Sequence, residues 1–135
     1  MDHEKKSRLV TKLASQSEPQ IVSIDVFFDG NDDSGSIGCN LLEHPGVEAF
    51  KSAFEKISNR QDVEAIYAQI AEIDPGEDSW PFTDTVIVFG SISVESLSKE
   101  LLHLEPDDIG KAKDFGVSAT TCSLHSSPAL AVWWD

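Results

Sequence analysis

An acidic, glycine-rich loop at residues 29–40, DGNDDSGSIGCN, holds the side chains of this sequence best suited to chemistry. Three of its side chains have the spacing of the first three oxygen ligands in a calcium-binding EF-hand loop: Asp29, Asn31 and Asp33. The pattern then fails, because the bend position holds Ser34 in place of glycine and the twelfth position holds Asn40 in place of a bidentate glutamate. We therefore predict no metal ligands. A metal- or small-ligand-binding regulatory domain that uses the 29–35 loop remains an alternative.

Other kinds of reactive site lack the residue pattern that they need. The loop glycines form no phosphate cradle, because no Gly-Lys-Ser or Gly-Lys-Thr ending follows and the nearby aspartates repel phosphate. The four histidines are scattered, without the HExxH spacing of a zinc site. Cys39, beside Asn40, keeps a small hydrolase as a further alternative, although its place after Ile37 and Gly38 favours packing in the core. We predict no catalytic residue, no cofactor and no enzymatic activity.

Tryptophans and carboxylates are sequence neighbours in two places. Trp80 follows the acidic turn 74–78, and Trp133, Trp134 and Asp135 end the sequence. Tryptophan is enriched among interface anchors, and adjacent carboxylates can pair with lysine or arginine of a partner. The alternative is that these indoles close the core. The candidate partner contacts are Asp29, Asp32, Asp33, Glu43, Asp74, Glu77, Asp78, Trp80, Asp84, Trp134 and Asp135.

The net charge limits which partners are suitable. With 24 acidic and 10 basic residues, the 135-residue chain carries a formal charge of -14, although residues 1–12 hold four basic side chains against two acidic ones. Such a surface repels nucleic acid and anionic lipid, and it accelerates encounter with a basic protein. We expect a basic protein as partner and no binding to nucleic acid or membrane. Nothing in the sequence indicates a homo-oligomer.

Cysteine usage and the lack of long apolar runs indicate a cytoplasmic protein. Cys39 and Cys122 are the only cysteines, which provides neither a disulfide framework nor the spacing of a structural zinc site. The first residues include lysine and arginine but no apolar run of signal-peptide length, and no run approaches a membrane span. We therefore expect a protein that stays in the cytosol.

Hydrophobic periodicity predicts the elements that must position these side chains. Apolar residues at i, i+3 and i+4 predict helices, and β-branched or alternating runs predict strands. In chain order we expect a helix over 3–15, a strand over 20–28, a helix over 47–58, a strand over 63–73, a strand over 83–90, a helix from Ser93 to Leu102, a short helix beginning at Pro106, a loop over 114–128 and a strand over 129–134. A helix is an alternative for 63–73, because of its alanines and glutamates.

This order of elements predicts a single α+β domain. After an N-terminal helical extension over residues 1–19, residues 20–135 follow the order β-α-β-β-α-β. That order fits a ferredoxin-like, mainly antiparallel sheet with helices on one face, and a related sandwich with another strand order is an alternative. In the ferredoxin-like topology the second strand runs parallel to the first. The 29–40 loop and the 74–82 turn would then lie at one end of the sheet and form one acidic patch.

Five segments point to a family when they are taken together: FFDGNDDSGSIGCNL at 27–41, HPG at 44–46, WPFTDTV at 80–86, LEPDDI at 104–109 and VWWD at 132–135. As a set they resemble the immunity protein 22 family of bacterial polymorphic-toxin systems, over residues 20–135. The resemblance implies a non-enzymatic α+β protein that binds and neutralises a cognate toxin domain, often a nuclease, delivered by a neighbouring cell or encoded beside it. It assigns no individual residue to toxin binding. We expect a cytoplasmic immunity protein that presents an acidic surface to a basic toxin.

Overall fold

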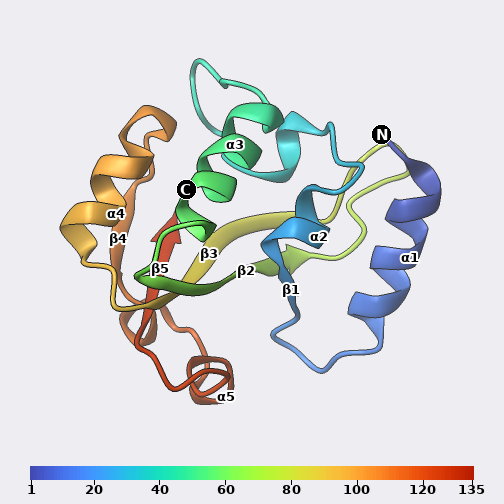
Figure 1. Cartoon of the computed structure of the whole chain (residues 1–135). Helices are drawn as coiled ribbons and strands as arrows, with labels where there is room; N and C mark the ends of the chain where they lie inside the picture. The colour runs from blue at the N-terminus through green and yellow to red at the C-terminus, as the bar shows by residue number, and fades with distance from the viewer.

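The computed structural model describes all 135 residues as a single-domain α+β fold, as the sequence predicts (Figure 1). Its strands are β1 (Ile21–Ser23), β2 (Val63–Glu72), β3 (Phe82–Gly90), β4 (Asp108–Lys111) and β5 (Ala129–Trp133). Its α-helices are α1 (His3–Ala14), α2 (Ile24–Phe28), α3 (Val47–Ser58), α4 (Val94–Leu101) and α5 (Ala119–Cys122). Short 3-10 turns lie at Ser34–Ser36, Leu102–Leu104 and Ala112–Phe115. No helix is both long enough and apolar enough to cross a membrane.

The elements with strong local signals are confirmed. The predicted helix over 47–58 is α3, whose apolar side chains at helical spacing, among them Phe50 and Phe54, are fully buried. Ser93 caps α4, because its hydroxyl oxygen accepts a hydrogen bond from the backbone N–H of Ser96 at 3.0 Å. The expected strands over 63–73, 83–90 and 129–134 correspond to β2, β3 and β5.

The first predicted strand is too long. Only Ile21–Ser23 is extended, and the chain then turns into α2, which buries Ile24, Phe27 and Phe28. The run from Ile21 to Phe28 suits a strand buried on both faces as well as a short buried helix, because a brief apolar run carries little periodicity. The helix is formed here because it places both phenylalanine rings in the core, where Phe28 stacks with Phe54 of α3 at a centroid distance of 6.4 Å.

The strand order is not ferredoxin-like. The antiparallel sheet has the order β1-β2-β3-β5-β4, and β2 pairs directly with β1, with Val22 opposite Ala68. A ferredoxin-like sheet would place the 83–90 strand between these two. The reason for the difference lies in α2 and the loop after it, which carry the chain back to the end of the sheet where β1 began. There Ile37 forms a bridge with Thr83 at the start of β3.

A fifth strand replaces the short helix expected after Pro106. Residues Asp108–Lys111 form β4, an edge strand that pairs with β5, with Ile109 opposite Val132. Pro106 followed by two aspartates is also the signature of a helix start, and that local signal led to the wrong prediction. The backbone bonds to β5, including the 2.8 Å bond from Asp107 N–H to the carbonyl of Trp133, decide in favour of the extended form.

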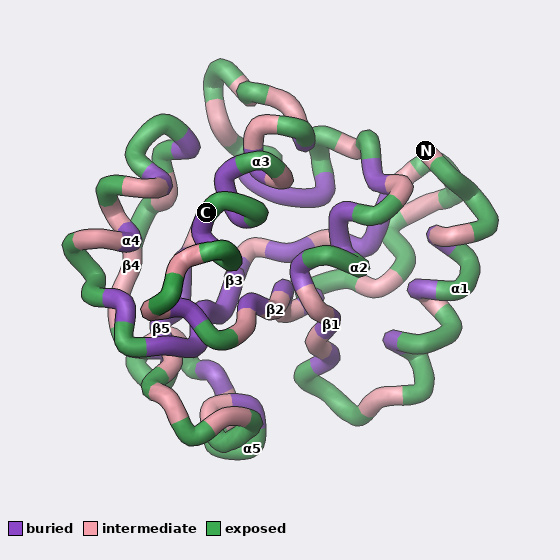
Figure 2. Tube along the Cα trace, viewed as in Figure 1, coloured by how far each residue is buried: buried purple, intermediate pink, exposed green.

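The main core lies on one face of the sheet. The aromatic rings of α3, the leucines of α4 and the inward side chains of β2, β3 and β5 form one cluster, which also includes Leu9 and Leu13 of α1. Figure 2 shows the buried part of α1 on the side of the helix that faces the rest of the fold. Asp2 caps this helix with a 3.0 Å bond from the N–H of Lys5, and that bond lowers the pKa of Asp2.

The other face of the sheet is partly covered by residues 112–123, so the expectation that helices occupy one face holds only for the longer ones. A smaller cluster there contains Ile87, Phe89 and Ala131 of the sheet beneath Ala112 and Val117. Figure 1 shows α5 on the opposite side of the sheet from α3. The segment predicted as a loop over 114–128 therefore contains part of a 3-10 turn and the short helix α5.

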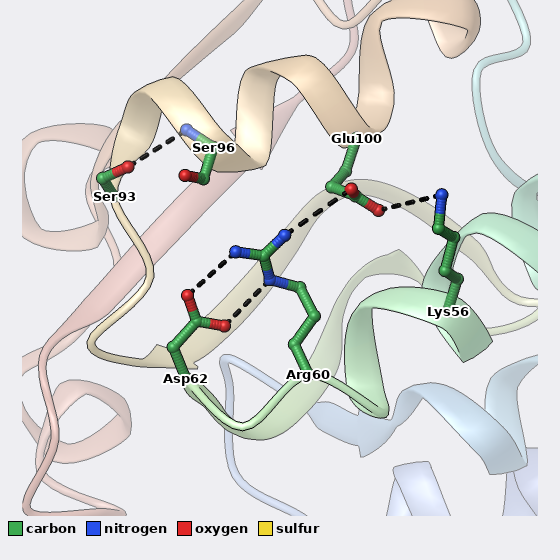
Figure 3. A network of polar contacts seen from close by, with 6 residues as sticks. All are labelled: Lys56, Arg60, Asp62, Ser93, Ser96 and Glu100. Carbon is green, nitrogen blue, oxygen red and sulfur yellow. Dashed lines mark hydrogen bonds and ion pairs between the residues drawn. The ribbon is translucent and has the colours of Figure 1, made fainter.

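Ion pairs join α3, α4 and the start of β2 (Figure 3). The Arg60 guanidinium bonds both carboxylate oxygens of Asp62, at 2.8 and 2.9 Å, and lies 3.5 Å from the carboxylate of Glu100. Lys56 approaches Glu100 from the other side at 3.7 Å. The carboxylate of Glu100 on α4 is therefore held between two basic residues that follow one another along α3 and its C-terminal turn.

Candidate protein-binding surface

The acidic loop after α2 is a folded turn stabilised by its own side chains. The Asn31 side-chain oxygen accepts a bond from Asp33 N–H at 2.9 Å, and the Asn31 amide donates to the Ser36 hydroxyl at 2.9 Å. One carboxylate oxygen of Asp33 accepts a bond from Gly35 N–H at 2.9 Å. Two of the three side chains that matched ligand positions, Asn31 and Asp33, therefore hold the loop together, and the third, Asp29, pairs with Lys5. No group of three or more His, Cys, Asp or Glu side chains is arranged to hold a metal ion.

The two acidic segments meet, as expected, but not for the reason expected. The second carboxylate oxygen of Asp33 accepts a 2.8 Å bond from the backbone N–H of Trp80, which follows the 74–78 turn. β2 runs antiparallel to β1, so the parallel direction of these two strands, from which we predicted this contact, is absent. The chain reverses through α2, which brings the first loop back to the end of the sheet where β2 leads into β3. The first loop and the β2–β3 connection therefore lie next to each other.

The basic N-terminal helix neutralises part of the acidic surface. Lys5 bonds Asp29 at 2.6 Å, and this bond raises the pKa of Lys5. The ammonium of Lys6, a largely buried residue, bonds the carbonyls of Gly76 and Glu77 and lies 3.2 Å from Asp74. The amino group of Met1 bonds Asp32 at 2.7 Å and lowers the pKa of that carboxyl. Three of the predicted contact residues, Asp29, Asp32 and Asp74, are thus already paired within the chain.

Other carboxylates at the same end of the sheet have no basic partner in the chain. We call this set the acidic edge, and it consists of Glu77, Asp78, Asp84, Asp107, Asp108 and Asp135. The backbone ties its parts together, because Trp134 N–H bonds the carbonyl of Asp84 at 2.9 Å and Asp135 N–H bonds the carboxylate of Asp107 at 2.5 Å. Asn40, from the first loop, donates a 3.0 Å bond to the carbonyl of Asp135. No ion pair within the chain involves a side chain of this set.

The remaining predicted contact residues lie in different places. Glu43 is exposed in the loop before α3 and makes no ion pair. The side chains of Trp80 and Trp134 lie in the core at 1% and 2% exposure, so they are not part of the acidic edge. The Trp134 indole N–H donates to the carbonyl of Leu104 at 2.9 Å, and its ring packs edge-on against Phe50 at 5.5 Å. Both indoles close the core, the alternative considered from sequence.

The sequence interpretation missed Asp107, Asp108 and Trp133 as surface residues. The two aspartates follow Pro106, where the sequence predicts a short helix, whereas in the structure they lead into β4 beside the C-terminal strand. Trp133 is half-buried on the face of β5 opposite to Trp134. The alternation of side chains in a strand does predict that one of two adjacent tryptophans faces outward, but which one depends on the sheet around it.

Cys39 is exposed, which corrects the expectation that it packs in the core. The chain turns at Gly38, where φ is +64° and a Cβ would lie 2.8 Å from the ring of Phe50. Gly38 itself is therefore the buried residue, because only glycine fits against that ring with this backbone conformation. Cys39, the next residue, lies outside the core and is exposed to solvent.

A second polar cluster lies on the α5 side of the sheet, at the end away from the acidic edge. The Tyr67 hydroxyl lies 2.8 Å from His125 Nε2, and the other ring nitrogen of His125 lies 3.1 Å from Glu64. Ser127 donates a 2.6 Å bond to Glu64, and this bond, with a smaller contribution from His125, lowers the pKa of Glu64. These contacts attach the 123–128 segment to β2. The Phe89 ring covers His125 at a centroid distance of 4.8 Å.

Comparison with known proteins identifies a family whose model covers nearly the whole chain. The family model described as "Uncharacterized protein YfbO family" matches residues 4–134. The chain belongs to the YfbO family. It is similar to the Escherichia coli (strain K12) protein named "Uncharacterized protein YfbO", with 26% identity over 118 residues that cover 85% of this chain and 82% of the relative. No solved structure matches the chain.

The extent of the YfbO match bears on the N-terminal helix. The matched range begins at residue 4, inside α1, whereas the resemblance to the immunity protein 22 family covers residues 20–135. The YfbO region therefore includes Lys5 and Lys6, which pair with the acidic segments, and Leu9 and Leu13, which enter the core. The family match therefore covers the basic helix and every residue of the acidic edge except Asp135.

Proposed function

We propose that this YfbO-family chain is an immunity protein, which binds and neutralises a cognate toxin domain through the acidic edge. The observation that carries the proposal is that six carboxylate residues, Glu77, Asp78, Asp84, Asp107, Asp108 and Asp135, lie at one end of the sheet without a basic partner in the chain. The net charge of -14 and the resemblance to the immunity protein 22 family support it. The proposal places the protein in the bacterial cytoplasm, without enzymatic activity.

The chemistry of such a surface favours a basic toxin, of which a nuclease is the best example. A nuclease binds a polyanion and therefore carries lysine and arginine around its active site. A surface of closely spaced carboxylates competes for that site, and the long-range field of the protein steers the encounter. Inhibition then follows from occupation of the toxin's active site or its substrate-binding face, with no covalent step.

Co-expression with the adjacent gene tests this proposal. The toxin-like domain encoded next to this chain is produced in bacteria with and without it, and growth, co-purification and affinity by titration calorimetry are measured. We expect restored growth and an affinity that weakens as salt rises, because exposed charges are screened. Failure to bind any neighbouring product, together with the absence of a toxin-like domain nearby, would overturn the proposal.

A pair of matched variants assigns the binding to the acidic edge. Glu77→Gln with Asp78→Asn removes two exposed carboxylates of the edge, and Glu55→Gln with Glu95→Gln removes two exposed carboxylates elsewhere. Both double variants change the net charge equally. We expect the first to lose about tenfold in affinity and the second to change it by less than about twofold. Equal losses would show that only net charge matters.

A further inference from the structure

A cleft lies on the α5 side of the sheet, at the acidic edge, and we call it the Trp133 cleft. Its lining consists of Gln69, Asp84, Thr85, Asp108, Phe115 and Trp133. Four of these residues form one row across the sheet, because Gln69 is opposite Thr85, Thr85 is opposite Trp133, and Trp133 is opposite Asp108. Directly opposed residues of antiparallel strands place their side chains on the same face. The half-buried indole of Trp133 is therefore a central part of the cleft, with a polar side chain on either side.

The charge of the cleft is negative and has no counterion within the chain. Asp84 and Asp108 line it from two different strands, and no lysine or arginine lines it. One oxygen of Asp84 accepts a 2.9 Å bond from the Thr85 hydroxyl, and one oxygen of Asp108 accepts a 2.9 Å bond from the N–H of Ile109. Each carboxylate keeps a second oxygen that no group of the protein bonds.

Gln69 contributes a polar side chain to the wall of the same cleft. Its side-chain oxygen is buried and has no hydrogen-bond donor in the protein. A buried polar atom without a partner is uncommon, because leaving it unpaired costs about 1 to 3 kcal/mol. Because that oxygen is closed off, the acceptors that the cleft offers are the free carboxylate oxygens of Asp84 and Asp108 beside one aromatic surface, and no basic residue lines it.

We propose that the Trp133 cleft receives an arginine side chain of the protein partner. A guanidinium is flat, stacks on an indole, and donates several hydrogen bonds in its plane, which suits an aromatic surface in a cleft that two carboxylates line. A lysine ammonium satisfies fewer of these acceptors and stacks less well. This inference rests on the proposed function in one respect, namely that it assigns the arginine to the toxin domain. Within the acidic edge, the Trp133 cleft is then the site that selects arginine over lysine.

Small arginine probes test the cleft without the toxin. The 15N-labelled chain is titrated with N-acetyl-arginine amide, N-acetyl-lysine amide and N-acetyl-citrulline amide, and the three tryptophan indole N–H signals are followed by NMR. Trp133→Phe assigns the signal of Trp133. We expect a saturable shift of this signal with the arginine probe, a weaker response to lysine, and none to citrulline, which has nearly the same shape without the charge. The signals of the buried Trp80 and Trp134 should not move.

Variants of the two carboxylates give the decisive comparison. Asp84→Asn with Asp108→Asn should weaken the arginine response by about fivefold or more, and Glu55→Gln with Glu95→Gln, two exposed carboxylates outside the acidic edge, should leave it unchanged. Unmoved Trp80 and Trp134 signals show that the variants are folded. An equal response to citrulline, or an unchanged response in the Asp84 and Asp108 variant, would overturn the inference.

The toxin experiment separates this inference from the proposed function. If the arginine probe binds at Trp133 and no neighbouring gene product binds the chain, the cleft is confirmed as an arginine site and the immunity function fails. If the toxin binds the Asp84 and Asp108 variant as tightly as the original chain, the immunity function stands and the assignment of the toxin's arginine to this cleft is wrong.

Discussion

The carboxylate of Asp33 bonds the backbone N–H of Trp80 at 2.8 Å, across 47 positions of sequence. Through this bond the loop after α2 and the connection between β2 and β3 form one unit. The same carboxylate also bonds Gly35 N–H at 2.9 Å, so a single side chain organises its own loop and joins it to the next one. The acidic end of the sheet thus has a defined shape despite its charge.

Replacement of Asp33 should separate the two loops. Asp33→Ala leaves the N–H of Trp80, beside a buried side chain, without its partner, so we expect the free energy of unfolding to fall by about 1 to 3 kcal/mol. Asp29→Ala removes an exposed carboxylate paired only with Lys5 and should cost less than about 1 kcal/mol. Urea denaturation measures both values. A smaller loss for Asp33→Ala than for Asp29→Ala would contradict this role.

Lys6 should fix α1 to the 74–78 turn. Its largely buried ammonium bonds two carbonyls and approaches Asp74, so Lys6→Met leaves those carbonyls unpaired while it keeps the aliphatic part of the side chain. We expect a loss of about 1 to 3 kcal/mol in the free energy of unfolding, and faster amide hydrogen exchange in the turn. The exposed Lys12 is the control, and Lys12→Met should change stability by less than about 0.5 kcal/mol. Unchanged exchange in the turn would argue against the contact.

The strongest elements were predictable because their signals are local. α3 carries five buried apolar residues at helical spacing, and Ser93 has the side chain that an N-cap needs. The boundary between β1 and α2 was not predictable in this way, because the apolar run from Ile21 to Phe28 suits either element. Where the strand ends and the helix begins depends on the tertiary packing of Phe28 against Phe54 in the core.

The candidate surface needed information that a single sequence does not carry. Pro106 and the aspartates after it satisfy the local rules for a helix start, and only pairing with β5, some 25 positions later, makes them a strand. That pairing puts Asp108 beside Trp133. The charge of the surface was predictable from composition, but its division into paired and unpaired carboxylates depends on where α1 docks. Lys5 and Lys6 lie against acidic segments more than 20 positions away.

Gly90 should be the least replaceable glycine of the sheet. Its φ is +154°, and a Cβ there would lie 2.1 Å from the carbonyl oxygen of Asp62, a contact with backbone that no side-chain movement relieves. We expect Gly90→Ala to lower the free energy of unfolding by more than about 3 kcal/mol. Gly116 has a φ of +76° with open space around it, so Gly116→Ala should cost only about 1 kcal/mol. Thermal and urea unfolding of both variants tests the difference. Similar losses would show that the close approach to Asp62 is relieved by a small backbone shift.

The bond between Arg60 and Asp62 should make stability depend on pH in the acid range (Figure 3). The guanidinium of Arg60 holds the pKa of Asp62 below its ordinary value of 3.8. Because the folded form has the lower pKa, the stabilisation is fully present above about pH 4 and is lost as pH falls through the folded pKa. The original chain should therefore exceed Asp62→Asn in stability at neutral pH, and the gap should narrow below pH 4. Urea midpoints measured from neutral pH into the acid range give this gap. A gap that stays constant as pH falls would show that the Asp62 side chain acts by packing and not by its charge.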